Sequence, residues 1–128
     1  MASQYRFFTP PSLKTATGRA GAVQAQLAAE FPAASPTFSA LSPVPELMAG
    51  TWALMRESLL AGVVPRIDKE VVATTVSRAN RCRFCVDAHT VLLHALGEHD
   101  LAERVARGDR PADPGLAALV RWAKATRT

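Results

Sequence analysis

Apolar residues recur along most of the chain at spacings of three and four positions, which is the period of one face of an α-helix. Proline, glycine and short polar runs separate the segments that show this pattern. No stretch alternates apolar and polar residues as a half-buried strand does. From these spacings and breaks we expect helices over residues 18–31, 45–60, 65–79, 82–96, 99–106 and 114–126. The sequence therefore predicts an all-α protein of about six helices.

The ends of the expected helices carry residues that cap or break a helix. A group of prolines indicates a loop between the first two helices, because each one lacks a backbone donor and restrains the residue before it: Pro32, Pro36, Pro43 and Pro45. Ser42 is the expected N-cap of the helix over 45–60, and Gly97 suits the position after the helix over 82–96. In the helix over 45–60, Met48 and Trp52 are expected in the core.

Length and composition indicate a folded, globular protein. The chain has 128 residues, of which 48% are hydrophobic and 20% are charged. We expect one domain over residues 1–128. Residues 1–18 contain prolines and small polar residues, so we expect an extended arm there, held to the body or to another subunit by Phe7 and Phe8.

Charge and hydropathy exclude several classes of function. The net charge of +4 comes from basic residues that are scattered along the chain, which does not indicate nucleic-acid binding. The longest apolar stretch, Leu47 to Val64, is interrupted by Arg56 and Glu57, so we expect no membrane span. The N-terminus lacks the apolar run of a signal peptide, and two cysteines three positions apart are a poor framework for a secreted domain. We expect a cytoplasmic protein.

The two central helices differ in their patterns. In the helix over 65–79, Glu70, Thr74 and Ser77 share one face opposite an apolar face. By pattern alone this polar face is predicted to be solvent-exposed, with Glu70 as an ordinary surface acid. The helix over 82–96 is apolar nearly all round, which predicts a buried central helix.

Candidate chemistry is concentrated where this central helix begins. Cys82 and Cys85 form a Cys-x-x-Cys at its start, where free backbone N–H groups and the helix dipole favour a thiolate over a thiol. Arg81 and Arg83 flank Cys82 and act in the same direction. His89 follows Cys85 at the i,i+4 spacing, which places both side chains on one helix face.

Three interpretations of the cysteine pair are open. A structural disulfide would close so short a loop that it contributes only about 2 kcal/mol, and cytosolic reductants would open it. Zinc could be held by Cys82, Cys85, His89 and His94, but His94 points roughly 120° away from the Cys82 direction on one helix. A site of two cysteines, one histidine and a water avoids this difficulty. A reactive dithiol with a nearby base fits all the features, so we favour it and expect no bound metal or other cofactor.

The spacing of these residues resembles the core motif of the AhpD-like family, which groups alkylhydroperoxidase D-type peroxidases with carboxymuconolactone decarboxylase relatives. Redox-active members carry a Glu, then a Cys-x-x-Cys, then a His four positions beyond the second Cys. Glu70, Cys82, Cys85 and His89 match this arrangement. The resemblance centres on residues 65–97.

The resemblance implies an all-helical, homo-oligomeric peroxidase that takes hydroperoxides as substrates. In this scheme Cys85 attacks the peroxide, Cys82 resolves the product to a disulfide, and His89 with Glu70 relays the proton. A dithiol reductant, such as a lipoylated or thioredoxin-like protein, would restore the thiols. Glu70 would then face the thiols and not the solvent, against the interpretation from pattern alone.

Two departures from the family pattern concern the mouth of the expected site. Phe84 occupies a position that is His in the best-known peroxidase, so one possible relay group is missing. Arg81 stands where a Gly often precedes the first Cys. The chain also ends soon after the helices expected over 99–106 and 114–126, which suggests that neighbouring subunits complete its core. Two alternative functions are a non-enzymatic, redox-sensing scaffold and a decarboxylase-like lyase; members of the lyase branch commonly lack the cysteine pair.

Overall fold

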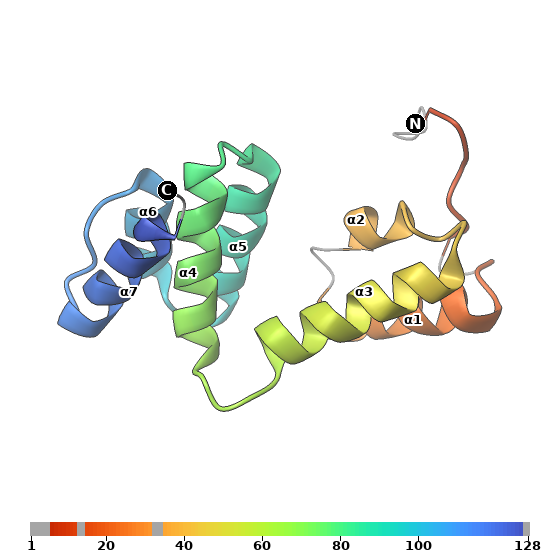
Figure 1. The fold of residues 1–128 in the computed structure, drawn as a ribbon, viewed down its shortest axis with the longest axis horizontal. Helices are drawn as coiled ribbons and strands as arrows, with labels where there is room; N and C mark the ends of the chain where they lie inside the picture. The colour runs from red at the N-terminus through yellow and green to blue at the C-terminus, as the bar shows by residue number, and fades with distance from the viewer. Residues whose placement is uncertain (1–5, 13–14, 32–34, 127–128) are drawn as a thin grey trace. The chain divides into compact units, whose positions relative to one another are not determined.

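The fold of the chain, shown as a computed structural model in Figure 1, consists of helices joined by short connections. The structure describes residues 6–12, 15–31 and 35–126. Within those ranges there is no strand. The all-α class predicted from the hydrophobic spacing is therefore confirmed.

Each expected helix is present, with ends shifted by a few positions. The helices are α1 (Gly18–Glu30), α2 (Ser35–Ser39), α3 (Pro45–Met55), α4 (Arg66–Ala79), α5 (Arg83–Ala95), α6 (His99–Arg107) and α7 (Pro114–Ala125). A π-helical segment, η2 (Arg56–Leu60), continues α3 to the end of the segment that the spacing predicted as one helix. The short α2 lies in the region that we expected to be a loop.

Contacts divide the chain into two compact units, Met1–Leu60 and Ala61–Thr128. Each unit is described here by itself. The expected single domain over residues 1–128, with an arm over residues 1–18, stays a prediction. Along the part of the chain that the structure describes, no helix is both long enough and apolar enough to cross a membrane.

The first unit is built from α1, α2 and α3. Met48 and Trp52 are buried as expected, and Trp52 packs edge-on against Phe38 with ring centroids 5.7 Å apart. The expected cap at Ser42 is wrong, because Val44 is the N-cap of α3 and makes no side-chain capping bond. Phe7 is 87% exposed in the single chain.

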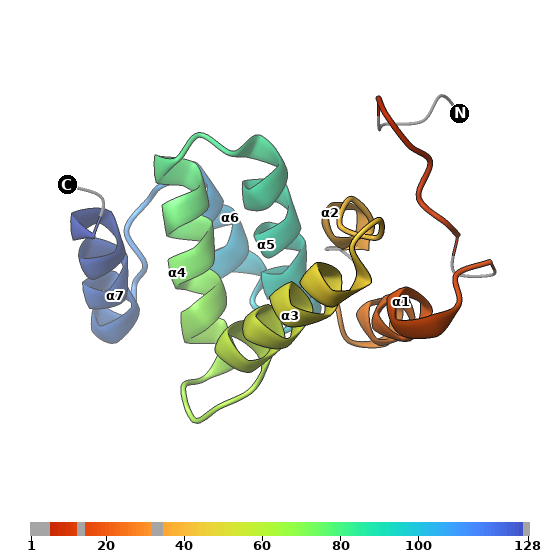
Figure 2. The same ribbon diagram turned by 45° about the vertical axis from the view of Figure 1, so that its right-hand side comes forward.

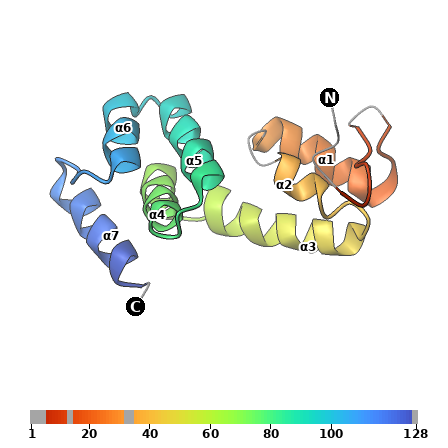
Figure 3. The ribbon, with the colours of Figure 1, turned by 90° about the horizontal axis from the view of Figure 1, so that it is seen from above.

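The second unit has α4 at its centre. In the views of Figures 2 and 3, α4 lies between α5 and α7, and α6 lies beside α5. The core of this unit is apolar and draws on all four helices: Val71, Leu93, Ala102, Val105 and Val120. The central position in this unit therefore belongs to α4.

Burial of α5 is less complete than its composition predicted. Leu93 is its one fully buried residue, whereas Phe84 is 53% exposed and Val91 is 58% exposed. The prediction that α5 is buried all round is therefore wrong for the single chain, because α4 and α6 cover only part of its surface. The expected opening of this helix on Cys-x-x-Cys is confirmed, since Cys82 is its N-cap.

Candidate active site

The turn between α4 and α5 delivers Cys82 to the start of α5. The N–H of Cys82 donates to Ser77 O at 3.0 Å, and the N–H of Arg81 donates to Arg78 O at 3.0 Å. These two bonds are the pair that ends a helix in a Schellman motif. Arg81 occupies the left-handed position of the motif with φ of 56°, where glycine avoids a strain of about 1–2 kcal/mol. This conformation explains why a glycine suits the position before the first cysteine.

Cys82 and Cys85 are joined by a disulfide at the N-terminus of α5, with their Cα atoms 5.3 Å apart. The Cys85 N–H also donates to Cys82 Sγ at 3.4 Å. Both residues are partly exposed. The pair is therefore accessible to solvent and lies where unpaired helix N–H groups stabilise negative charge on sulfur.

Glu70 of α4 is completely buried, so the prediction of a solvated acid is wrong. Its carboxylate accepts a bond from Arg66 Nε at 2.6 Å and is bonded to His89 Nδ1 at 2.7 Å. Thr74 and Ser77 of the same face are buried too, and the Thr74 hydroxyl donates to Glu70 O at 2.8 Å. A polar face can be buried here because the Glu70 carboxylate and the Thr74 hydroxyl have partners within the protein.

His89 of α5 has its side chain 17% exposed and lies one helical turn after Cys85. An ionised carboxylate only accepts hydrogen bonds, so the bond to Glu70 makes Nδ1 the donor. Nε2 then carries a free lone pair and can take a proton. The structure thus brings Glu70 of α4 into direct contact with His89 of α5, the helix that begins with the cysteine pair.

Arg66 is a member of this group that our sequence analysis did not identify. It lies on α4 four residues before Glu70 and has its side chain 26% exposed. The signal was present in the sequence, since Arg and Glu four positions apart on a helix commonly pair. Without knowledge that Glu70 is buried, this pair was indistinguishable from an ordinary surface pair.

His94 does not join the cysteines. Its Nδ1 is bonded to His99 Nδ1 at 2.9 Å, and its Nε2 is bonded to Glu103 Oε1 at 3.1 Å. In the described ranges there is no group of three or more His, Cys, Asp or Glu residues that could hold a metal ion. The four-ligand zinc interpretation therefore lacks its fourth ligand.

Comparison with known proteins adds two matches. Residues 45–125 match the model of the carboxymuconolactone decarboxylase family. The chain is also 41% identical over 121 residues to the alkyl hydroperoxide reductase Rv2159c of Mycobacterium tuberculosis, a match that covers 93% of this chain and 35% of the relative. The chain thus spans about a third of the length of this curated relative. No solved structure matches the chain significantly.

Proposed function

Because the chain belongs to the carboxymuconolactone decarboxylase family, within its AhpD-like proteins, we propose that it is a thiol-dependent peroxidase that uses Cys82 and Cys85. The observation that carries the proposal is the bond from buried Glu70 of α4 to His89, which lies on the helix that begins with the cysteine pair. The 41% identical relative is an alkyl hydroperoxide reductase, which supports hydroperoxide reduction as the reaction.

The proposed cycle begins with the pair reduced. A cysteine thiolate attacks the terminal oxygen of the hydroperoxide, the O–O bond breaks, and the alkoxide leaves as the alcohol after it takes a proton. The attacking cysteine is now a sulfenic acid. The second cysteine attacks this sulfur, the disulfide forms, and the hydroxyl leaves as water. One hydroperoxide and two thiols thus give one alcohol, one water and one disulfide.

Glu70 and His89 supply the proton transfers in this proposal. Glu70 holds the His89 ring with Nδ1–H toward the carboxylate, so Nε2 is free to remove the thiol proton and later return it to the leaving alkoxide. Arg66 supplies a partner for the other oxygen of the buried Glu70 carboxylate through the bond of 2.6 Å. The roles of Glu70, His89 and both cysteines as catalytic residues are parts of this proposal.

We assign the attack on peroxide to Cys85, since it lies four residues before His89 on the same helix face. Cys82 would then be the resolving residue. The contact from the Cys85 N–H to Cys82 Sγ at 3.4 Å also favours negative charge on Cys82, so the assignment needs a direct test.

The cysteine variants provide this test. With a small dithiol as reductant, we expect Cys82→Ser and Cys85→Ser each to abolish catalytic turnover of an organic hydroperoxide. Only Cys82→Ser, which keeps the attacking thiol, should trap one sulfenic acid per chain when a sulfenic-acid reagent is present. Trapping in Cys85→Ser alone would reverse the two roles. If the unsubstituted protein is oxidised by one equivalent of hydroperoxide but shows no turnover, the chain is a redox sensor and not a peroxidase.

The reductant and the assembly are further parts of the proposal. A dithiol, free or carried on a lipoylated or thioredoxin-like protein, would exchange with the Cys82–Cys85 disulfide and regenerate both thiols. A homo-oligomer would cover apolar side chains that are exposed in the single chain, such as Phe84, Val91 and Trp122. Sedimentation of the protein at micromolar concentration should give a multiple of the chain mass, and a monomer mass would contradict the assembly.

A further inference from the structure

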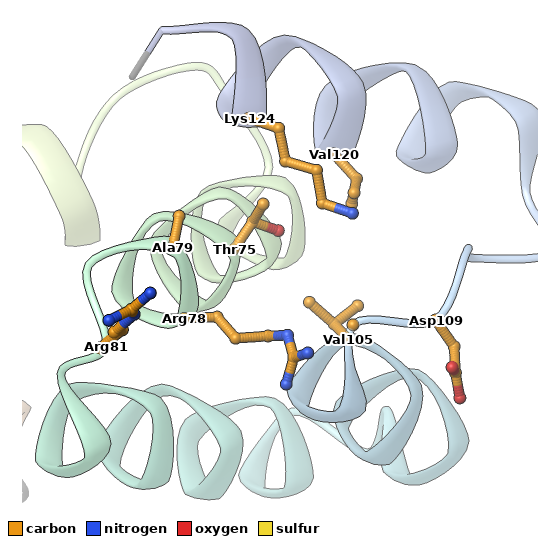
Figure 4. Close-up of a pocket in the computed structure, with 9 residues that line it drawn as sticks. Thr75, Arg78, Ala79, Arg81, Val105, Asp109, Val120 and Lys124 are labelled. Carbon is orange, nitrogen blue, oxygen red and sulfur yellow. The ribbon is translucent and has the colours of Figure 1, made fainter. Parts of the chain in front are cut away.

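A concave site of about 420 Å³ lies between α4, α6 and α7 in the second unit, as Figure 4 shows. This volume is within the range of pockets that hold small ligands. None of the residues placed in the peroxidase cycle lines it. Its apolar lining includes Ala79, Val105 and Val120, while Arg78, Arg81 and Lys124 supply positive charge.

The positive charge of this pocket is not balanced by carboxylates. Asp109 is the one acidic residue in the lining, and it already pairs with Arg107 at 3.3 Å. Among the residues that the structure describes, no carboxylate lies in ion-pair contact with Arg78, Arg81 or Lys124. Three cations beside apolar walls create a local potential that attracts an anion.

One of the cations is held in place before any ligand binds. Arg78 donates from Nη1 to Ala106 O at 2.9 Å, so its guanidinium is tied to the end of α6. It also lies against Gly108, where a Cβ would come within 2.6 Å of Arg78 Nη2 and where φ is +86°. The remaining N–H groups of Arg78 are available to a ligand, and Figure 4 shows Lys124 extending from α7 toward the same space.

We propose that this pocket binds a small organic anion, in which a carboxylate or phosphate is attached to a short apolar group. The oxyanion would accept hydrogen bonds from Arg78 and Lys124, because guanidinium and ammonium groups form charge-assisted bonds with both kinds of anion, and Arg81 would add positive charge at the rim. The apolar group would contact Val105 and Val120. The residues of the proposed peroxidase cycle do not line this site, although Arg81 directly precedes Cys82.

Isothermal titration calorimetry with four probes tests the proposal: butyl phosphate, pentanoate, inorganic phosphate and butanol. We expect saturable binding of butyl phosphate or pentanoate, weaker binding of inorganic phosphate, and none of butanol. Whichever organic anion binds more tightly then shows whether the pocket prefers a phosphate or a carboxylate group. Lys124→Gln should weaken that binding about tenfold, the loss of one charge-assisted bond. Arg121→Gln, which removes the same charge from an exposed position of α7 outside the pocket lining, should change it less than about twofold.

Two results would overturn the proposal. One is the absence of saturable binding by either organic anion at millimolar concentration. The other is an equal loss of affinity in Lys124→Gln and Arg121→Gln, which would indicate attraction by overall charge only. Arg78→Gln is a poorer test because it also removes the bond to Ala106 O at the end of α6. The readout needs no peroxide and no thiol chemistry, so its failure leaves the peroxidase test unaffected.

Discussion

The second unit contains two groups of the same composition, each with an arginine, a glutamate and a histidine, in very different surroundings. In one, Glu70 accepts from Arg66 at 2.6 Å and bonds His89 at 2.7 Å. In the other, Glu103 pairs with Arg107 at 3.4 Å and with His94 at 3.1 Å. The side chain of Glu70 is 0% exposed, while that of Glu103 is 54% exposed.

The difference shows that burial, and not composition, decides what such a group can do. Around Glu103, water competes for every hydrogen bond and salt screens the charges, so the group contributes little stability. Glu70 has no access to water, so its carboxylate depends on its two partners and fixes the His89 ring in one orientation. We propose that only the buried group directs a proton, and the substitutions below compare the two groups.

The largest expected difference is between the histidines. His89→Ala should lower turnover of an organic hydroperoxide about 10²–10⁴-fold, because it removes the general base of the proposed cycle. His94→Ala on the same helix should lower it less than about twofold, since surface pairs make small contributions. The measurement is steady-state turnover with a saturating dithiol reductant. Comparable losses in the two variants would remove the distinction between the groups.

A smaller difference is expected between the glutamates. Glu70→Gln keeps the size of the side chain but loses its charge, so we expect about a tenfold loss of turnover, less than the loss of the base itself. It should also lower the free energy of unfolding by about 1–3 kcal/mol, because a buried charged bond is disrupted. Urea unfolding and turnover of the same preparations provide both values.

Glu103→Gln is the matched control for this substitution. Its effect on the free energy of unfolding should stay within about 0.5 kcal/mol, as for most exposed substitutions. Turnover should not change measurably. If Glu70→Gln behaves like this control, the carboxylate of Glu70 has no role in activating His89.

The smallest difference is expected between the arginines. Arg66→Gln should reduce turnover a few-fold, since Glu70 would lose one of its partners while it keeps the other. Arg107→Gln removes a longer contact at an exposed position and should have no measurable effect on turnover. Urea unfolding of both variants distinguishes positioning from simple loss of stability. Only Arg66→Gln should lower turnover under conditions in which the protein remains folded.

The sequence predicted most of the helices because their apolar spacing and their proline and glycine ends are local features. It did not predict the surroundings of Glu70, since helical periodicity shows which residues share a face but not whether another helix covers that face. The resemblance to a family corrected this point, because it placed Glu70 toward the cysteines. Arg66 was missed for the same reason, as its pairing matters only when Glu70 is buried.

The burial of α5 shows the opposite error. An apolar composition on all sides predicted that the whole helix is covered, whereas neighbouring helices in the single chain leave Phe84 and Val91 exposed. Composition reports which side chains favour burial but not how many neighbours one chain provides. The predicted cap at Ser42 is wrong because polar residues are common near helix starts, and α3 begins at Pro45, three residues after Ser42, with Val44 as its N-cap.

The most direct test of the central claim is a thiol titration of the reduced protein before and after one equivalent of an organic hydroperoxide. We predict that both thiols disappear together, that mass spectrometry finds an intramolecular Cys82–Cys85 disulfide, and that dithiothreitol restores both thiols. Two free thiols after excess hydroperoxide, or only irreversible over-oxidation of one cysteine, would contradict the account.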